Sequence, residues 1–198
     1  MLNLLFFLFV ISLSYLIGSI CSAVIVCKLC SLPDPRTEGS QNPGATNVLR
    51  LAGKKYAVIV LLADMLKGFL PLLLGKMFGV GPAVLGFMCL AAVLGHIYPI
   101  FFEFKGGKGV ATALGSILGL NFLLGFIACL IWFLVAKISR YSSLASIVAV
   151  SSTPILILFY PGGRGAFFPL LLMAGLILYQ HRENIIRLKN KTESKITL

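Results

Sequence analysis

The stretch LNLLFFLFVISLSYLIGSICSAVIVC, residues 2–27, decides the class of this protein, because it contains no charged side chain. A helix needs about 20 apolar residues to cross the hydrocarbon core of a bilayer. The first basic residue is Lys28, directly after the stretch, and basic residues accumulate on the inner side of a membrane. We therefore expect a first membrane-spanning helix whose N-terminus lies outside.

The composition of the whole chain agrees with a membrane protein. Of its 198 residues, 59% are hydrophobic and only 12% are charged, whereas a soluble domain is about half apolar and a quarter charged. The net charge of +11 would suit a nucleic-acid binder, but a mean hydropathy of +1.00 excludes that class and also excludes a disordered chain. The length predicts a single domain over residues 1–198.

Further apolar stretches occupy residues 56–75, 80–100, about 109–120, 121–136, 142–160 and 166–180. The stretches at 109–120 and 121–136 are ambiguous, because together they would form a helix of roughly 42 Å, against about 30 Å for one crossing. Two short spans would instead turn near Gly119, Leu120 and Asn121.

The distribution of basic residues favours the model with two spans there and seven in all. With the N-terminus outside, 2 basic residues lie outside, Lys76 and Arg164, while Lys67 lies within a span. The inner segments then contain 14 basic residues: Lys28, Arg36, Arg50, Lys54, Lys55, Lys105, Lys108, Lys137, Arg140, Arg182, Arg187, Lys189, Lys191 and Lys195. A six-span model distributes them 8 to 8, so the positive-inside rule predicts seven helices with a cytoplasmic C-terminus.

Two polar segments have compositions suited to binding an anion. The first is DPRTEGSQNPGATNVLR, residues 34–50, in which glycines allow close backbone approach and hydroxyl, amide and guanidinium groups donate hydrogen bonds. The second contains KGGKG, residues 105–109, directly before an apolar helical stretch, and a helix N-terminus favours phosphate. The alternatives are an ordinary cytoplasmic loop and a tight turn with interfacial lysines.

A third polar segment, HRENIIRL at residues 181–188, places His181 and Asn184 on one helix face. The alternative is a solvated basic tail. Asp64 and Lys67 are also three residues apart, within a predicted span, where ionisable groups are costly and should pair or face a polar interior. A structural pair and a functional role both fit these two residues.

The remaining inventory limits the chemistry. The acidic residues are too dispersed for a carboxylate-bound magnesium site, and neither His-x-x-x-x-Asp nor Gly-x-Ser-x-Gly occurs. The five cysteines lie mostly in apolar runs and suit packing better than zinc or redox chemistry. We therefore expect no metal and no cofactor, and a phosphate-bearing substrate that arrives already activated, for which orientation and charge stabilisation supply the catalysis.

The three segments closely resemble the PlsY family of bacterial acyl-phosphate:glycerol-3-phosphate acyltransferases. The similarity extends over nearly the whole chain, from Gly18-Ser19-Ile20 to Glu193, and includes Asp64-x-x-Lys67-Gly68. It implies a seven-span enzyme of the bacterial inner membrane whose active site faces the cytoplasm. The implied reaction transfers an acyl chain from acyl phosphate to the sn-1 hydroxyl of glycerol 3-phosphate, giving lysophosphatidic acid and phosphate. The implied partners are these substrates, membrane lipid and the soluble enzyme that makes acyl phosphate.

The resemblance also implies roles for individual residues. Ser40, Arg50 and Lys108 are the expected glycerol 3-phosphate ligands. Lys105 and the amides of Gly106, Gly107 and Gly109 are candidates for the acyl-phosphate anion. Asn42, Thr46 and Asn47 would shape the pocket, and His181 and Asn184 would close it. Among these, Ser40, His181 and Asn184 are the catalytic candidates; the substrate phosphate and His181 compete as acceptor of the hydroxyl proton.

The chain departs from the family pattern at three positions. Cys21 stands where proline is usual, Gln41 where glycine is usual, and Lys191 where glycine is frequent. Gln41 adopts positive φ less freely than glycine, so the loop geometry there is open to change. The second hypothesis for the chain is a transporter of a phosphate-bearing anion, although its polar groups lie in inner loops rather than at the bilayer midplane; a structural membrane protein is a third.

Overall fold

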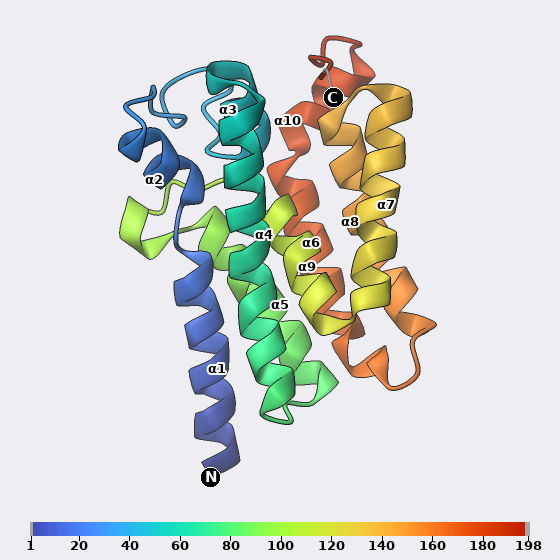
Figure 1. The fold of residues 1–198 in the computed structure, drawn as a ribbon. Coiled ribbons are helices and arrows are strands. Elements are labelled where there is room, and N and C mark those ends of the chain that lie inside the picture. The colour runs from blue at the N-terminus through green and yellow to red at the C-terminus, as the bar shows by residue number, and fades with distance from the viewer. Residues whose placement is uncertain (1, 197–198) are drawn as a thin grey trace.

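The computed structural model describes residues 2–196 as a bundle of helices, and this part of the chain contains no β-strand (Figure 1). The expected all-α architecture is confirmed. The long helices are α1 (Leu2–Gly18), α4 (Lys54–Met77), α5 (Pro82–Ile97), α7 (Phe122–Ser139), α8 (Ser142–Leu158) and α9 (Phe167–Gln180). The shorter ones are α2 (Ser22–Leu29), α3 (Ala45–Ala52), α6 (Val110–Leu120) and α10 (Arg182–Lys189), with 3₁₀ turns η1 (Ile100–Phe102) and η2 (Gly163–Ala166).

Five segments are long and apolar enough to cross a membrane: Asn3–Leu29, Lys54–Met77, Pro82–Phe102, Phe122–Ser139 and Gly163–Gln180. Large apolar side chains such as Leu62, Phe126 and Phe133 point outward from the bundle and stay exposed. A soluble protein rarely exposes so continuous an apolar surface, whereas lipid chains cover it without cost. The two remaining apolar helices, α6 with 11 residues and α8 with 17, fall outside this group, and seven crossings remain a prediction.

The break expected near residues 119–121 is present. Helix α6 ends at Leu120 and α7 begins at Phe122, and the Asn121 side chain between them accepts a hydrogen bond from the Leu124 amide at 3.0 Å. Asn121 thus caps α7 in the way expected of an asparagine at this position. At 1.5 Å per residue, the 11 residues of α6 extend over only about 16 Å, so α6 alone is too short for a full crossing.

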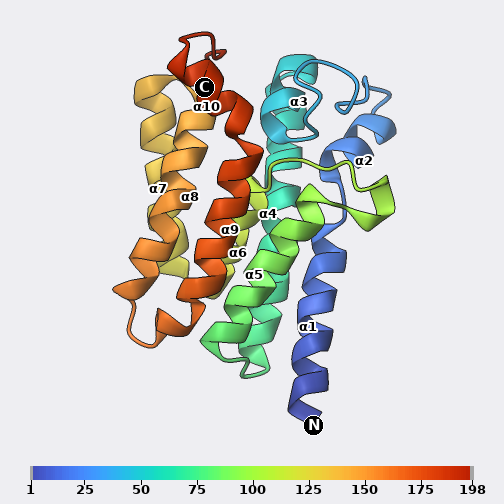
Figure 2. The same cartoon turned by 180° about the vertical axis from the view of Figure 1, so that it is seen from behind.

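Helix α6 lies at the centre of the bundle and packs closely against α4, because glycines remove the side chains between them. A methyl group on Gly68 would collide with the Thr112 carbonyl oxygen, and one on Gly115 would collide with the Met65 carbonyl oxygen. Small residues at such contacts are the usual means of helix association in membranes. Behind α6, the apolar core joins it to α5 and α9, the two helices seen in front in Figure 2.

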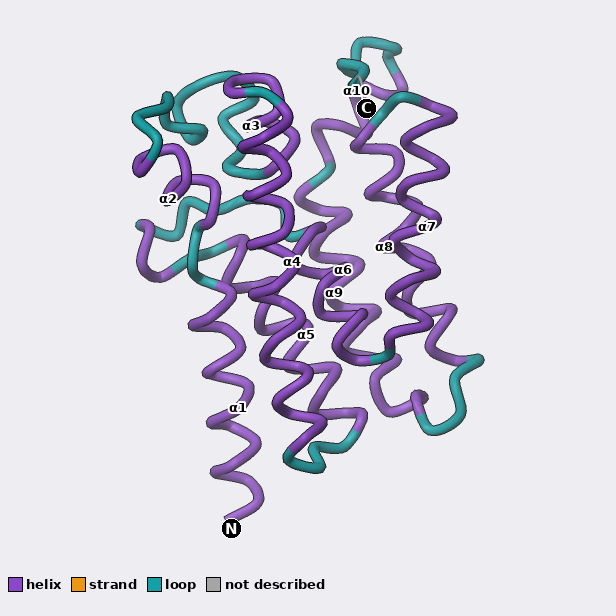
Figure 3. Tube along the Cα trace, in the orientation of Figure 1, coloured by secondary structure: helices purple, strands orange, loops and turns teal. Residues whose placement is uncertain are grey.

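The loops and short helices gather mainly at the two ends of the bundle (Figure 3). The N-terminus lies at one end and the C-terminus at the other, together with α2, α3 and α10 (Figure 1). The segment after η1 enters the bundle below α3 and leads into α6. Helix α1 does not continue directly into α2, because the chain is non-helical at residues 19–21, and this break places α2 beside α3 and α4.

Candidate active site

A cavity of about 700 Å³ opens among the helices at the end of the bundle that carries α3 and α10. Residues in the first turns of four helices line it: Ala45, Thr46 and Asn47 of α3, Val110 and Ala111 of α6, Ser142 and Ser143 of α8, and Glu183 and Asn184 of α10. Amide groups in a first turn have no partner within their helix, and the helix dipole places partial positive charge there. The cavity is therefore suited to an anion.

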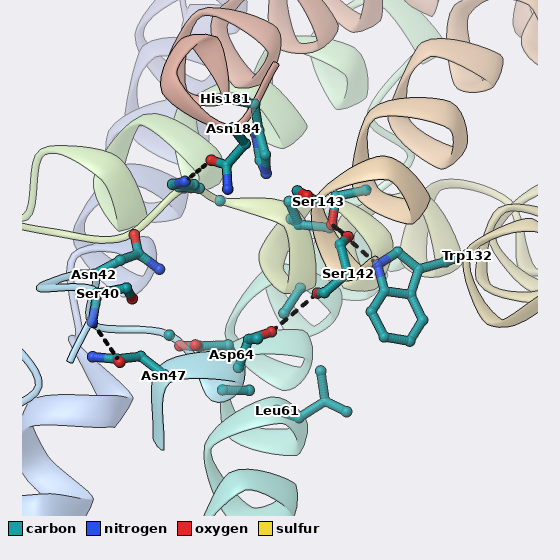
Figure 4. A pocket seen from close by; sticks show the side chains of 18 of the residues that line it. Ser40, Asn42, Asn47, Leu61, Asp64, Trp132, Ser142, Ser143, His181 and Asn184 are labelled. Atoms are coloured by element: carbon teal, nitrogen blue, oxygen red, sulfur yellow. Dashed lines mark hydrogen bonds between the residues drawn. The ribbon is translucent and has the colours of Figure 1, made fainter. Parts of the chain in front are cut away.

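The loop that carries Ser40 is held in place by Asn47, whose side chain is almost completely buried. Asn47 Oδ1 accepts a hydrogen bond from the Ser40 amide at 2.9 Å, and Nδ2 donates to the carbonyls of Pro35 and Glu38, both at 3.0 Å. One side chain thus satisfies three backbone groups and presents Ser40 to the cavity (Figure 4). Asn47 therefore fixes the backbone of this loop, and its role in shaping a substrate pocket stays a prediction.

The unusual Gln41 keeps the backbone geometry that glycine would provide. Its φ is 56°, and the preceding Gly39 also lies in the left-handed region with φ of 63°. A non-glycine residue adopts this conformation at some cost in free energy. Gln41 therefore adopts the left-handed conformation that a glycine would adopt more freely.

Lys108 reaches into the cavity from the segment before α6 and contacts Asn184. Its Nζ donates to Asn184 Oδ1, while Asn184 Nδ2 donates to Glu193 Oε1 at 2.7 Å. Burial lowers the pKa of the Lys108 ammonium, and the nearby Arg187 lowers it further. An incoming phosphate would relieve both effects, because an opposite charge favours the protonated amine.

Glu193 anchors this side of the cavity. Besides Asn184, Ser143 donates to its Oε1 at 2.7 Å and Arg187 Nε donates to its Oε2 at 2.7 Å. Burial raises the pKa of this carboxyl group, but the hydrogen bonds from Arg187, Ser143 and Asn184 outweigh it and lower the pKa overall. Glu193 therefore stays ionised and joins α8 to α10.

His181 lies at the junction of α9 and α10 and is 3% exposed. Its Nδ1 lies 2.8 Å from the Ile177 carbonyl oxygen, which can only accept, so Nδ1 carries the proton and Nε2 keeps a free lone pair. Burial lowers the pKa of His181 to about 4. The imidazole is therefore neutral near pH 7 and lines the cavity as a hydrogen-bond acceptor.

The structure brings most of the predicted site residues to this one cavity. Ser40 and Asn42 face it from one side, His181 and Asn184 from another, and Trp132 lies opposite (Figure 4). Thr46 bridges α3 and α8 through a 3.1 Å contact between its Oγ1 and Ser142 Oγ. Arg50 also lines the cavity and takes part in none of the ion pairs formed within residues 2–196, so its guanidinium is available to a ligand.

Three predicted residues do not line the cavity. Lys105 is exposed and pairs with Glu103 at 2.9 Å. The Gly106 amide donates to the Ile97 carbonyl at 3.2 Å, and the Gly107 amide donates to the His96 carbonyl at 3.1 Å. Both amides are thus occupied by backbone carbonyls in this structure, contrary to the free amides expected for binding the acyl-phosphate anion. Gly109 does line the cavity, with φ of 85° directly before α6, and so do Val110 and Ala111 in the first turn of α6.

Several residues that line the cavity were not predicted from the sequence. Ser142 and Ser143 read only as the start of an apolar span, although a pair of hydroxyls after Arg140 marks a helix start. The apolar wall, formed by Leu61, Met65, Leu114, Cys129 and Trp132, left no pattern in the sequence, because these residues resemble lipid-facing ones. Within residues 2–196, no group of three or more His, Cys, Asp or Glu side chains is arranged to hold a metal ion.

Comparison with known proteins identifies the family. The sequence model described as glycerol-3-phosphate acyltransferase matches residues 8–191. A glycerol-3-phosphate acyltransferase of Legionella pneumophila (strain Lens) is 51% identical over 191 residues, which are 96% of this chain and 69% of the relative. One from Colwellia psychrerythraea is 52% identical over 184 residues, 93% of each chain.

Two solved structures share the fold. Both are crystal structures of PlsY (YgiH), described as an integral membrane glycerol 3-phosphate acyltransferase. The glycerol 3-phosphate form has a TM-score of 0.90 at 44% identity and covers 96% of each chain. The lysophosphatidic acid form has a TM-score of 0.88 at 43% identity and covers 96% of this chain and 95% of the other. This chain is therefore a member of the glycerol-3-phosphate acyltransferase family of integral membrane proteins, with the fold of PlsY.

Proposed function

We propose that this protein transfers the acyl group of an acyl phosphate to the sn-1 hydroxyl of glycerol 3-phosphate. The products are lysophosphatidic acid and inorganic phosphate. The observation that carries the proposal is the two-sided character of the cavity. Helix N-termini, Arg50 and Lys108 form one part of its wall, and apolar side chains of α4, α6 and α7 form another. Such a cavity suits a molecule with both phosphate and a hydrocarbon chain.

The wall chemistry favours an activated donor. A carboxylic–phosphoric anhydride already has a good leaving group, so the protein needs only to hold the two substrates and stabilise negative charge. The hydroxyl oxygen of glycerol 3-phosphate forms the new bond to the acyl carbon, and the bond from that carbon to the phosphate oxygen breaks. The lining residues supply cations and amides for this purpose rather than a nucleophile oriented by a base.

The hydroxyl proton has two candidate acceptors. One is the phosphate of the donor, which leaves as inorganic phosphate and takes the proton with it. The other is Nε2 of His181, whose ring is neutral and holds its proton on Nδ1. Replacing His181 with Asn tests the choice: if the phosphate is the acceptor, the variant should keep most of its kcat.

The proposed orientation places the active site toward the cytoplasm of a bacterium, in its inner membrane. The cavity opens at the same end of the bundle as α2, α3 and α10, where most basic residues lie. Basic loops stay on the cytoplasmic side. The termini lie at opposite ends of the bundle, which agrees with an odd number of crossings.

The direct test uses purified protein with acyl phosphates of several chain lengths and glycerol 3-phosphate. We expect one phosphate released for each lysophosphatidic acid formed, with the ester at carbon 1 by NMR. A chelator should not change the rate, and acyl thioesters should not replace the donor. Absence of product with every acyl phosphate would refute the proposal. Flux of glycerol 3-phosphate into proteoliposomes without acyl transfer would favour a transporter instead.

A further inference from the structure

A cluster of buried polar side chains lies beneath the anion-binding part of the cavity, where α4, α5 and α6 meet. Asp64 and Lys67 of α4 form an ion pair, with Lys67 Nζ 2.7 Å from Asp64 Oδ1. His96 of α5 has its Nδ1 3.7 Å from the same oxygen and 3.1 Å from Thr112 Oγ1 of α6. All four side chains are nearly completely buried. Asp64 and His96 also line the cavity, but none of the four is among the proposed substrate ligands.

One side of the cluster supports the break between α1 and α2. The chain leaves the helical path at residues 19–21, and carbonyls at such a break lose the amide that would have bonded to them. Lys67 Nζ donates to the Ile20 carbonyl at 2.7 Å and replaces that amide. The break sets the position of α2, which packs through Ala23 and Cys27 against Val48 of α3. Helix α3 carries Asn47, the side chain that holds the Ser40 loop.

The other side of the cluster supports the glycine segment before α6. The Gly107 amide donates to the His96 carbonyl, and the Gly107 Cα packs so closely on the ring that a methyl group there would collide with His96 Nε2. The same methyl group would lie 3.0 Å from the Pro43 carbonyl oxygen. Gly107 thus packs against both the His96 ring and the loop that follows Ser40.

We propose that Asp64, Lys67 and His96 are positioning residues that fix the Ser40 loop and the Lys108 segment at one spacing. The cluster is linked to both segments. Lys67 bonds to the break before α2, and α2 packs on α3, which holds the Ser40 loop. His96 contacts Gly107, which directly precedes Lys108. The inference rests on the proposed function, since the spacing matters because both segments face the same phosphate-bearing substrate. It gives a role to the ion pair that the sequence left open.

The chemistry of the cluster fits positioning rather than proton transfer. His96 Nδ1 faces Thr112 and Asp64, and Nε2 faces Gly107, so both ring nitrogens are directed at protein groups. A buried ion pair often contributes little net stability compared with an apolar pair of similar volume. The directed bond from Lys67 to the Ile20 carbonyl, and the charge of Asp64 beside the His96 ring, are contacts that an apolar pair could not supply. Asp64 lines the cavity, and its negative charge would repel an anion there. Lys67 neutralises that charge.

Two double variants, both uncharged at residues 64 and 67, distinguish a positioning role from an effect of the charges or of stability. Asp64→Asn/Lys67→Gln keeps a donor at residue 67, whereas Asp64→Asn/Lys67→Met removes it; both remove the ion pair. We expect the methionine variant to raise the KM for glycerol 3-phosphate about tenfold, the loss of about one hydrogen bond to a charged group, with a smaller change in kcat. The glutamine variant should stay within about threefold of the wild type.

Hydrogen exchange supplies a readout that does not depend on turnover. Peptides over residues 101–112 and 35–47 should exchange faster in the methionine variant than in the glutamine variant, while α7 and α9 stay unchanged. Equal exchange in these two segments with an unchanged KM would overturn the proposal, and so would acceleration spread evenly over all helices. If the double variants do not fold, Thr112→Val and Thr112→Ser provide the same comparison at the His96 contact.

The failure of this inference is distinguishable from failure of the proposed function. A wild-type protein without acyl transfer would refute the function, and the exchange comparison would still decide whether the cluster fixes the two segments. A wild-type protein with activity, combined with equal KM and exchange in the threonine variants, would refute the positioning role alone.

Discussion

At the scale of single residues, the site depends on side chains that join two backbones or two other side chains. Asn184 is the clearest example, because its amide oxygen receives Lys108 and its amide nitrogen donates to Glu193. An aspartate there would retain the acceptor for Lys108 but would place a carboxylate against that of Glu193. The site therefore needs both the acceptor oxygen and the donor nitrogen of the Asn184 amide.

Arg50 and Lys108 should control affinity for glycerol 3-phosphate. We expect Arg50→Ala and Lys108→Ala each to raise the KM by about 10- to 100-fold, because each removes a charge-assisted contact to phosphate. Lys105→Ala is the matched control: the side chain has the same charge, lies three residues from Lys108, and is exposed and paired with Glu103. Steady-state kinetics should show little change for it. Equal defects in all three variants would indicate a general electrostatic effect in place of specific contacts.

Glu193 should stabilise the fold in a pH-dependent way. Its hydrogen bonds lower the pKa of the folded carboxyl below the ordinary 4.5, so the stabilisation is complete above about pH 4.5 and is lost as the pH falls through the lowered value. Glu193→Gln should therefore lower stability by about 2 kcal/mol at pH 7, and the difference from wild type should shrink below pH 4. Thermal unfolding in detergent at both pH values measures this. A difference that is the same at both would contradict it.

His181 should not impose a pH dependence near neutrality. Since burial lowers its pKa to about 4, the imidazole gains its proton only as the pH falls toward that value. The rate of wild type divided by the rate of His181→Asn should therefore stay constant between pH 8 and pH 6, and fall only below about pH 5. Parallel pH–rate profiles provide the ratio. A change in the ratio centred near pH 6.5 would mean that the imidazole is solvated.

At the scale of secondary-structure elements, glycine contacts keep α4 and α6 together. Gly68→Ala or Gly115→Ala should force the two helices apart and lower the apparent melting temperature, because in each case the added methyl group meets a carbonyl oxygen of the other helix. Gly175→Ala, in α9, is the control, since its added methyl group has nothing within 4 Å. Alanine there should leave the melting temperature unchanged or slightly raised. Equal losses in α4, α6 and α9 would show that close packing is not the cause.

The sequence predicted most of the helices, but it did not predict all of their contacts or which of their faces line the cavity. Asn121 marked the break between α6 and α7, since asparagine caps helices and glycine precedes it. The sequence analysis did not predict that the Gly106 and Gly107 amides are hydrogen-bonded, although Pro99 indicates it. Proline ends α5 near Ile97 and leaves the last carbonyls of the helix without helical partners, and the two glycine amides donate to these carbonyls. The apolar wall of the cavity could not be predicted, because lipid-facing and cavity-facing residues have the same composition.

At the scale of the whole molecule, the proposed orientation can be tested with an existing thiol. Cys30 is exposed in the loop after α2, on the end that carries the cavity. A membrane-impermeant maleimide should label it in inside-out vesicles and not in intact spheroplasts. In a Cys30→Ser background, Arg164→Cys lies at the opposite end and should show the reverse pattern. Labelling of both positions from one side would contradict an odd number of crossings between them and the proposed topology.

The anchoring of residues 193–196 has a consequence for how the protein is made. Glu193 joins α8 to α10, the Ile196 amide donates to the Arg140 carbonyl at 2.8 Å, and the Ile196 side chain is buried against Ala136 and Ala145. The Ser40 loop, by contrast, is synthesised early. The contacts that join α8 to α10 therefore form only after residues 193–196 have left the ribosome, so a chain that is still being inserted into the membrane lacks this side of the cavity.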